Sequence, residues 1–409
     1  MMYRAMIALA TIVGCLSLVA STPDVDVLTL ARATSRFSLQ LYKELALNPT
    51  VAFYSPFSAH TALSIAYLGA RGTTAEQIKT VLQLSSLPEP HDAYSKLLTD
   101  LNSTQRVTLL TANGLWANPT LPVLQEYKDS VASKYFAQVG VLEFSKAGGP
   151  EGPINSYIAQ QTQGKITDVL GVRDVKPGTS TVLVNALFFS GAWKSPFDVR
   201  DTKTGAFQKN ERIDLQVDFM TQVGTFDLKL SAVENVDVVR LPFLDERFAL
   251  YIALPNAPSD LAAFETQITG ESFDINVLFT GLTSTRVNLT LPKWNITSTL
   301  KLNNALIDLG MPEIFTQAAD FSGISGLPIS FMQILQKVAI EVSETGTVAS
   351  AADVVVLAGS RQSFEEPPVD FKADHPYVYF LRDDLTGLIL FQGKQADPTI
   401  SHFTAGELS

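Results

Sequence analysis

The distribution of hydrophobic patterns along the chain predicts an α+β fold with large mixed sheets. Helical patterns are concentrated in the first part and strand patterns in the later part, without the regular alternation that builds doubly wound parallel sheets. The chain has 409 residues, 46% of them hydrophobic and 17% charged, so it can bury a large core. Length alone suggests two or three domains, but no Gly/Ser-rich, Pro-rich or charged linker divides the sequence, and we expect one large domain.

The first 21 residues have the pattern of a secretory signal peptide. Arg4 precedes an apolar stretch, Ala5 to Val19, and small residues follow it before a Thr-Pro pair. The stretch is too short and wrongly flanked for a membrane-spanning helix; the alternative is a buried first helix. We expect removal of residues 1–21 and secretion of residues 22–409. Cys15 is the only cysteine, so the mature protein is expected to have no disulfide.

Three Asn-x-Thr/Ser triplets predict glycosylation in a secreted protein. They begin at Asn102, Asn288 and Asn295, and Asn295 lies in a predicted strand. Asn48 and Asn118 are excluded because a proline follows each of them. We favour Asn102 among the three.

Helices account for most of the predicted elements in the first part of the chain. Apolar residues at helical spacing from Leu30 to Leu45 predict an amphipathic first helix that ends before Asn48-Pro49. The further elements, in chain order, are a short strand from Val51, a buried apolar helix after Ser55-Pro56 that stops near Gly69, a short helix opened by a capping box at Thr73–Glu76, a helix at Tyr94–Leu101, a strand at Val107–Ala117, a helix at Leu124–Phe136, a strand at Gln138–Phe144 and a helix at Asn155–Leu170.

Strands account for most of the later part. The continuous apolar run Thr181–Gly191 is typical of a central sheet strand, and alternation of apolar and polar residues predicts strands between Val217 and Leu254. The remaining elements are a helix at Leu261–Ile268, a strand at Val287–Ile296 interrupted by Pro292, a helix at Leu300–Leu309, a strand at Gln336–Val342 and a closing hairpin whose strands, Tyr377–Leu381 and Gly387–Gly393, pair across Arg382–Thr386.

The composition and motifs argue against an enzyme. The net charge of −11 argues against nucleic acid and against anionic membrane surfaces, and no basic helical face indicates a heparin site. The four histidines lack the spacing of metal ligands, and no nucleophile elbow, phosphate-binding loop or dinucleotide fingerprint occurs. We therefore predict no metal, no cofactor and no catalytic residue. His60 lies on an apolar helix, and we interpret it as a hydrogen-bonded core histidine.

Residues 336–371 join a buried strand to a segment of unusual character. Val338, Ile340 and Val342 alternate with polar or small neighbours, as in a sheet. Beyond Gly346 the chain has small residues and then Val354 to Leu357, a run of high β-propensity that would normally lie within a sheet. It is followed by an acidic, Pro-rich stretch instead. The segment therefore reads as a strand held outside a sheet.

The chain resembles the serpins, a family of serine protease inhibitors, over essentially everything after residue 21. The motifs that carry the resemblance follow the family's order along the chain: Ser55–Ser58, Leu68–Thr74, Ile154-Asn155, Thr162–Ile166, Val184–Trp193, Leu241–Phe243, Leu291–Lys293, Ala319–Ile324, Gln336–Thr347 and Phe371–Pro376. The resemblance implies a monomer with three β-sheets, eight or nine helices and an exposed reactive-centre loop at about 344–371. It also implies a suicide inhibitor that traps its protease covalently.

The family's mechanism gives the loop a physical role. The protease cleaves the loop and forms an acyl-enzyme, and the loop then inserts into the main sheet and carries the protease with it. About fifteen inserted residues at ~3.3 Å each move the protease by about 50 Å and distort its oxyanion hole.

The resemblance assigns two groups of residues to this insertion. The hinge residues are Glu344, Gly346, Thr347, Ala349 and Ala351, of which Gly346 lets the backbone turn and the alanines are small enough to enter a sheet. Ser55, Ser58 and Asn185 match the polar cluster beneath the sheet opening, and Trp193 matches the aromatic residue at its top. Gln336 and Tyr377 depart from the family's usual histidine and phenylalanine.

Two features of the loop leave alternatives open. The usual spacing from Glu344 places the cut between Ser360 and Arg361, but Arg361 is the only basic residue between Lys337 and Lys372. A trypsin-like pocket requires Arg or Lys before the cut, so we favour the bond Arg361–Gln362 and a trypsin-like target.

Asp353 is the second feature. Counting alternate residues from Thr347 places it on the inward face, where a buried carboxylate costs several kcal/mol unless it is paired. An inward-facing Asp353 favours the alternative function, that of a non-inhibitory carrier, storage or signalling protein. In that case a protease cleaves the loop as an ordinary substrate and is not trapped.

Overall fold

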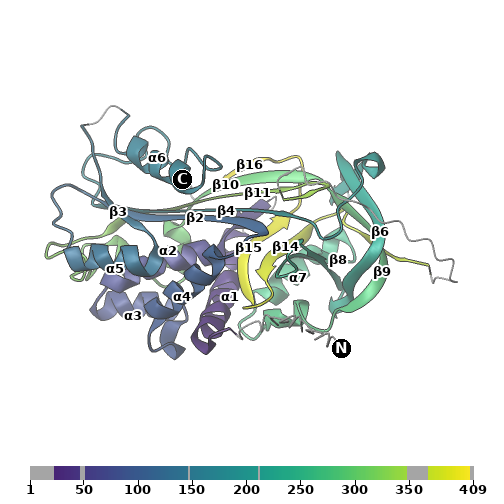
Figure 1. Cartoon of the computed structure of the whole chain (residues 1–409), viewed down its shortest axis with the longest axis horizontal. Helices are drawn as coiled ribbons and strands as arrows, with labels where there is room; N and C mark the ends of the chain where they lie inside the picture. Colours follow the sequence, from purple (N-terminus) through teal and green to yellow (C-terminus); the bar gives the residue numbers. More distant parts are fainter. Residues whose placement is uncertain (1–22, 47–50, 146–147, 211, 348–366, 406–409) are drawn as a thin grey trace, which may run out of the picture.

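The computed structural model describes residues 23–46, 51–145, 148–210, 212–347 and 367–405 (Figure 1). These residues contain eight α-helices: α1 (Val25–Leu45), α2 (Pro56–Gly69), α3 (Gly72–Val81), α4 (Pro90–Asn102), α5 (Gln125–Tyr135), α6 (Glu151–Gln161), α7 (Leu261–Ile268) and α8 (Asn303–Asp308). The strands are β1 (Val51–Tyr54), β2 (Val107–Ala117), β3 (Gln138–Val141), β4 (Thr181–Ala192), β5 (Lys203–Asn210), β6 (Ile213–Val233), β7 (Val236–Pro242), β8 (Phe248–Pro255), β9 (Thr283–Pro292), β10 (Trp294–Lys301), β11 (Phe331–Val342), β12 (Gly346–Thr347), β13 (Val369–Lys372), β14 (Tyr377–Asp383), β15 (Leu388–Gln395) and β16 (His402–Ala405).

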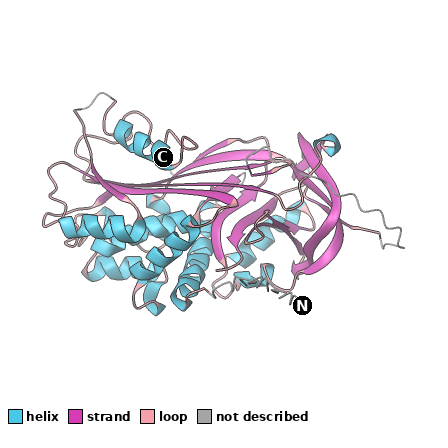
Figure 2. Ribbon diagram, in the orientation of Figure 1, coloured by secondary structure: helices cyan, strands magenta, loops and turns pink. Residues whose placement is uncertain are grey.

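One layer of the molecule is a seven-stranded sheet with β4 near its centre. The strand order is β16-β10-β11-β4-β2-β3, and β12 pairs with β4. Strand β4 is mostly apolar because both of its faces are covered: Leu183 and Leu187 belong to the main core, and Val182 and Val184 to a smaller core under α6. In Figure 2 most helices lie on one side of this sheet and α6 on the other.

The second sheet has nine strands, in the order β1-β15-β14-β8-β7-β6-β9-β13 with β5 beside β6. Strand β6 has 21 residues and changes partner along its length: its start pairs with β5, its middle with β9 and its end with β7. The resemblance implied three sheets. In the described residues the second and third of these are joined by hydrogen bonds because β6 runs through both.

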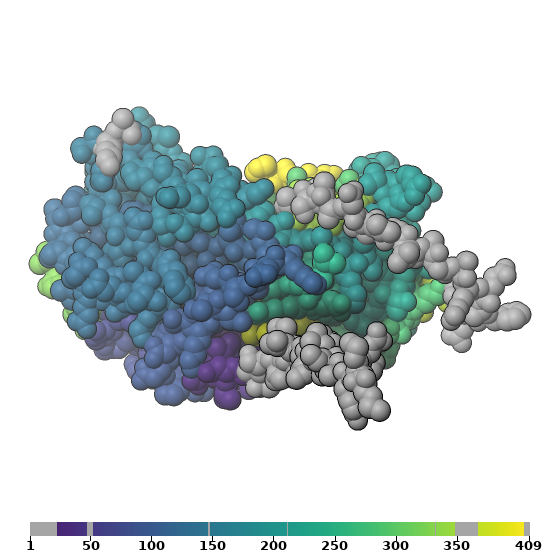
Figure 3. All heavy atoms as spheres, viewed as in Figure 1, coloured from purple at the N-terminus to yellow at the C-terminus, as the bar shows by residue number. Residues whose placement is uncertain are grey.

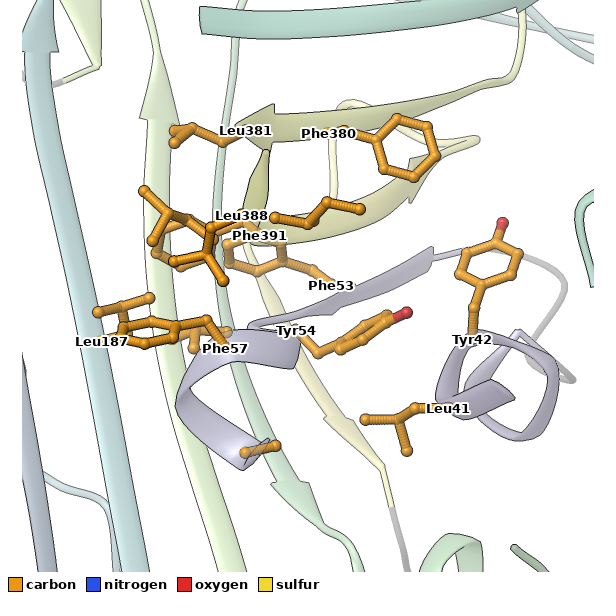
Figure 4. Packing of buried hydrophobic residues seen from close by; sticks show 14 of the residues in the cluster. Leu41, Tyr42, Phe53, Tyr54, Phe57, Leu187, Phe380, Leu381, Leu388 and Phe391 are labelled. Carbon is orange, nitrogen blue, oxygen red and sulfur yellow. The ribbon is translucent and has the colours of Figure 1, made fainter. Parts of the chain in front are cut away.

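The main core fills the space between the helices and the two sheets. Figure 4 shows side chains that meet there from both termini of the domain and from its centre: Leu41 and Tyr42 of α1, Phe53 and Tyr54 of β1, Phe57 of α2, Leu187 of β4, Phe380 and Leu381 of β14, and Leu388 and Phe391 of β15. This core therefore connects the helical layer to both sheets. The single domain expected from the sequence stays a prediction.

Four local predictions were wrong, two of them about helices in the first part of the chain. The capping box at Thr73–Glu76 does not form, because α3 already begins at Gly72 and Thr73 lies inside the helix. The neighbouring Thr74 hydroxyl donates to Glu313 and accepts from the N–H of Asp320. Helix α6 ends at Gln161, and the Asn155 side chain accepts hydrogen bonds from the N–H groups of Val169 and Leu170. The Asn155 side chain thus stabilises a non-helical segment where the sequence predicted a helix.

The predicted strand Val287–Ile296 is also two strands. Pro292 ends β9 in one sheet, and after Lys293 the chain enters β10 in the other sheet. Strand β10 continues to Lys301, so that the helix predicted from Leu300 begins only at Asn303. Only Lys293 separates the two strands, and Pro292 favours the end of β9 because proline cannot donate a ladder hydrogen bond.

His60 is the buried core histidine that the sequence predicts. It has no exposed surface, its Nε2–H donates to the Leu82 carbonyl at 2.9 Å, and its Nδ1 contacts the Tyr94 hydroxyl. Burial lowers the pKa of His60 to about 4 from its usual 6.5, because the imidazolium form would lose its hydration. The neutral ring is therefore the folded form over the physiological range.

Folding stability is expected to fall as the pH decreases from 6.5 toward 4. In this window the unfolded chain protonates His60 and the folded protein does not, so His60 alone lowers the free energy of unfolding by about 3 kcal/mol across the window. Urea unfolding at pH 6.5 and 5 should show a smaller difference for His60→Gln than for the parent protein. The exposed His402 supplies the control, His402→Gln, and an equal effect of both changes would contradict this role of burial.

Candidate functional site

The chain reverses direction immediately after β11 and returns along β4. A tight turn links the backbone of Ser343 and Gly346 through two hydrogen bonds, of 3.0 and 3.3 Å. Gly346 and Thr347 then form β12, antiparallel to β4 and opposite Ala192 and Gly191. The start of the predicted loop is therefore paired with the main sheet.

Only glycine fits at position 346. Its φ is +142°, and a Cβ atom there would lie 2.1 Å from the Gly191 carbonyl oxygen. The close approach of the two backbones leaves no space for a side chain. The hinge role that the resemblance implies for Gly346 stays a prediction.

Thr347 is the first side chain of the segment that enters the protein. It has no exposed surface, and its Oγ1 accepts a hydrogen bond from the Gly191 N–H at 2.9 Å. The parallel ladder between β11 and β4 ends at Ala339 and Phe188. If this ladder continued in register, Val342 would pair with Gly191. Thr347 pairs with Gly191 instead.

Glu344 anchors the turn through buried polar contacts. Its carboxylate accepts hydrogen bonds from Thr202 at 2.8 Å and from the Lys293 ammonium at 3.0 Å. Its carbonyl accepts from the Phe197 N–H at 2.9 Å. Burial alone would raise the pKa of Glu344, but its own backbone N–H, Lys293 and Thr202 together hold the pKa below its usual value. The group is thus an ionised carboxylate with satisfied oxygens.

Trp193 contacts the turn through both its indole ring and its backbone. Its indole Nε1–H donates to the Ser343 carbonyl at 2.9 Å, and its backbone N–H donates to the Thr345 carbonyl at 3.0 Å. The ring stacks on Phe243 with centroids 4.6 Å apart. Trp193 therefore holds the turn through two backbone carbonyls.

A polar cluster lies beneath the sheet between β11 and β4. Gln336 and Asn185 face each other across the two strands, and the Gln336 amide donates to Asn185 Oδ1 at 3.1 Å. The same amide donates to the Ser55 carbonyl and accepts from the Ser55 N–H, at 2.8 and 2.9 Å, and the Ser58 hydroxyl donates to Asn185 Oδ1 at 2.8 Å. All four side chains are buried. The cluster joins the start of α2 to the two strands that would separate if a loop entered between them.

The structure brings together some of the predicted site residues and not others. Glu344, Gly346, Thr347 and Trp193 meet at the turn, and Ser55, Ser58 and Asn185 meet in the polar cluster. Several predicted residues lie outside the described residues: Ala349, Ala351, Asp353, Ser360, Arg361 and Gln362.

Sequence reasoning missed three parts of this arrangement. Gln336 was noted only as a departure from the family, yet it makes most of the bonds of the polar cluster. Lys293 was noted only as part of a motif, and a lone lysine gives no sign of its distant partner Glu344. Thr202 carries no sequence signal. Tyr377 keeps a satisfied hydroxyl, which accepts from the Trp294 indole at 2.9 Å.

The three glycosylation candidates differ in accessibility. Asn102, at the end of α4, and Asn295, in β10, are exposed. Asn288 is half-buried, and its side-chain amide donates to Asp370 at 2.8 Å. The side chains of Asn102 and Asn295 are therefore accessible to a glycan-transferring enzyme.

The described ranges contain neither a candidate metal site nor a candidate membrane-spanning helix. No cluster of three His, Cys, Asp or Glu residues there could hold a metal ion. No helix in those ranges is long and apolar enough to cross a bilayer.

Comparisons with known proteins point to a single family. The chain matches the model of one protein family, described as serpin (serine protease inhibitor), over residues 32–398. It is 35% identical to human serpin B8 over 377 residues, which cover 90% of this chain and 99% of that protein. It is 32% identical to the leukocyte elastase inhibitor of Xenopus tropicalis, again over 90% of this chain and 99% of the relative.

A solved structure gives the same result. The crystal structure of Serpin48, described as a highly specific serpin of the insect Tenebrio molitor, superimposes with a TM-score of 0.82 at 30% identity. The superposition covers 92% of this chain and all of that one.

Proposed function

The chain belongs to the serpin family of serine protease inhibitors, and we propose that it is a secreted inhibitor that traps a trypsin-like serine protease. The observation that carries this proposal is the pairing of Gly346–Thr347 with β4. The first residues of the loop already occupy the top of the position that an inserted strand would fill. Insertion would extend this antiparallel pairing downward as β11 leaves β4.

The proposed trapping reaction uses the protease's own chemistry. The protease serine attacks the carbonyl carbon of Arg361, an ester forms, and the amine of Gln362 leaves with the C-terminal part of the loop. Insertion of about fifteen residues at ~3.3 Å each then moves the ester-linked protease before water can hydrolyse the ester. The inhibitor itself supplies no catalytic group.

The polar cluster supports the same proposal. To admit a strand, β11 must part from β4 over Phe331–Ala339, and the bond between Gln336 and Asn185 must break. Buried polar groups need new partners when they lose old ones. We propose that Ser55 and Ser58, at the start of α2, keep such partners available while the strands separate.

Replacing Arg361 tests both the scissile bond and the class of protease. Arg361→Ala is expected to slow inhibition of a trypsin-like protease by about 10²-fold or more, because the acidic specificity pocket is left without its basic partner. The measurement is the rate of complex formation that survives SDS, across a panel of trypsin-like and chymotrypsin-like proteases. Lys176→Ala, at an exposed position, is the control for loss of a positive charge.

Mass spectrometry of the released C-terminal peptide identifies the bond directly. A peptide beginning at Gln362 supports the proposal, and one beginning at Arg361 shows that Ser360 precedes the cut. Unchanged inhibition by Arg361→Ala, with cleavage elsewhere, would exclude the trypsin-like assignment.

We infer secretion and glycosylation from the sequence of residues 1–21 and from the exposure of Asn102 and Asn295. N-terminal sequencing of the secreted protein should begin at Thr22. Mass after enzymatic deglycosylation should report the occupied asparagines. We propose no cofactor and no heparin-type activator, in line with the net charge of −11.

Asp353 favours a second candidate function, that of a non-inhibitory serpin. If this carboxylate enters the sheet without a partner, insertion slows and the ester is hydrolysed first. The ratio of SDS-stable complex to cleaved protein separates the two candidates. Cleavage without complex, and without a rise in thermal stability, supports the non-inhibitory reading.

A further inference from the structure

The C-terminal strand β16 covers one edge of the seven-stranded sheet. Its residues His402–Ala405 run parallel to β10 and pair with Thr297–Leu300, and the Thr297 N–H donates to the Ser401 carbonyl at 2.9 Å. Figure 1 shows β16 beside β10 at the rim of the sheet, and the C-terminal residues appear in yellow at the upper surface in Figure 3. The family match ends at residue 398, so this strand lies beyond the part of the chain that the family shares.

Without β16, β10 would be an edge strand with few protective features. Its eight residues, Trp294–Lys301, are rich in threonine and β-branched residues, carry no charge before Lys301 and contain no proline. Its register with β11 runs without a bulge. Long, uncharged edge strands pair readily with other chains, and natural sheets usually interrupt or cover them. The opposite edge, β3, is only four residues long.

Phe403 and Ile400 hold β16 against the sheet. Both are partly buried and pack on the main core, whereas Ser401, His402 and Thr404 are exposed. Phe403 faces Ser298 of β10, whose hydroxyl is buried and has no hydrogen-bond partner among the described residues. Phe403 and Ile400 therefore supply the apolar contacts between the C-terminal segment and the core.

The connection from β15 to β16 is short, and an ion pair between Asp397 and Lys209 holds it. Asp397 is 6% exposed, and its carboxylate accepts from the Lys209 ammonium at 2.8 Å and from the N–H and hydroxyl of Thr399 at 3.1 and 2.5 Å. Beyond Thr399 the strand is held by its backbone pairing and by the side chains of Ile400 and Phe403. A four-residue strand with two apolar anchors can leave more easily than a central strand.

We propose that β16 is a detachable cover of the β10 edge, and that the uncovered edge is a docking surface for the β16 segment of a second copy of this chain. The structure shows that this segment fits the edge in register, with Phe403 over Ser298. Exchange of an identical element between two copies needs no new contacts and gives a closed, symmetric dimer. The inference depends on the sheet edge alone and stands apart from the proposed inhibitory function.

Single-cysteine variants provide the test, in a Cys15→Ser background of the full chain. Thr299 and Thr404 are paired residues, and neighbouring strands lie about 5 Å apart, which suits a disulfide. Thr299→Cys and Thr404→Cys proteins are mixed, warmed below the unfolding transition, cooled and oxidised. A covalent heterodimer is expected on a non-reducing gel. The Lys301→Cys protein is the matched control, because its cysteine lies two residues out of register with Thr404, and its heterodimer should be lost.

Three outcomes overturn the proposal. One is the absence of heterodimer although each variant keeps the thermal midpoint of the parent. Another is equal crosslinking by the out-of-register control. The third is homodimer formed by Thr299→Cys alone, which would show that two β10 edges meet each other.

A double variant removes any dependence on how well the single variants fold. Thr299→Cys/Thr404→Cys, oxidised as a dilute monomer, ties β16 to its own β10. Light scattering after the same warming step should show monomer for the oxidised form and dimer for the reduced form. Dimer in both forms would also overturn the proposal.

Discussion

Thr347→Arg is expected to abolish the covalent complex with the target protease while leaving loop cleavage intact. Thr347 has no exposed surface and occupies the position on β4 opposite Gly191. An arginine there must either bury an unpaired charge or keep the hinge out of the sheet. A penalty of about 3 kcal/mol on insertion slows it on the order of 100-fold, and hydrolysis of the ester then competes successfully.

The readout is the fraction of protease in SDS-stable complex at a fixed inhibitor ratio, measured together with the fraction of cleaved loop. Thr345→Arg is the matched control, because Thr345 lies in the same turn and is exposed. It should leave the complex nearly unchanged. If Thr347→Arg still forms complex in full yield, insertion does not pass through position 347, and the pairing of β12 with β4 has no part in trapping.

The elements were predictable where a single local pattern determines them. The apolar run of β4 and the hairpin of β14 and β15 follow from patterns of adjacent residues, and both were confirmed. The capping box failed because α3 begins at Gly72, which places Thr73 inside the helix. The helix predicted to Leu170 failed because the Asn155 side chain accepts hydrogen bonds from Val169 and Leu170. In the second case a side-chain contact outweighed a local helical preference.

The site was predictable in its residues more than in its contacts. The resemblance identified Glu344, Gly346 and Thr347, but no pattern in the sequence shows that Glu344 meets Lys293 and Thr202. Such pairs are far apart in the chain, and each residue alone reads as an ordinary surface group. The strand β16 was not predicted either, because His402–Ala405 is too short for a periodic signal.

An ion pair between Arg247 and the buried Asp383 joins the nine-stranded sheet to the helical layer. Arg247 donates from Nε to Asp383 Oδ1 at 2.8 Å and from Nη2 to Oδ2 at 2.7 Å, and Nη2 also reaches Asp100 at 2.5 Å. The Asp383 carboxylate is fully buried at the end of β14, whereas Asp100, on α4, is exposed to water. Arg247 therefore joins the β14–β15 hairpin to the helical layer.

Arg247→Ala is expected to lower the free energy of unfolding by about 3–5 kcal/mol, because Asp383 is left as a buried charge without its partner. Urea unfolding at pH 7 measures the change, and Arg200→Ala is the control: Arg200 pairs with Asp198 at the surface, and its removal should not shift the midpoint. Adding Asp383→Asn to Arg247→Ala should recover part of the loss, because an amide does not require a countercharge. If the double variant recovers nothing, the loss arises from packing of the arginine and not from the stranded carboxylate.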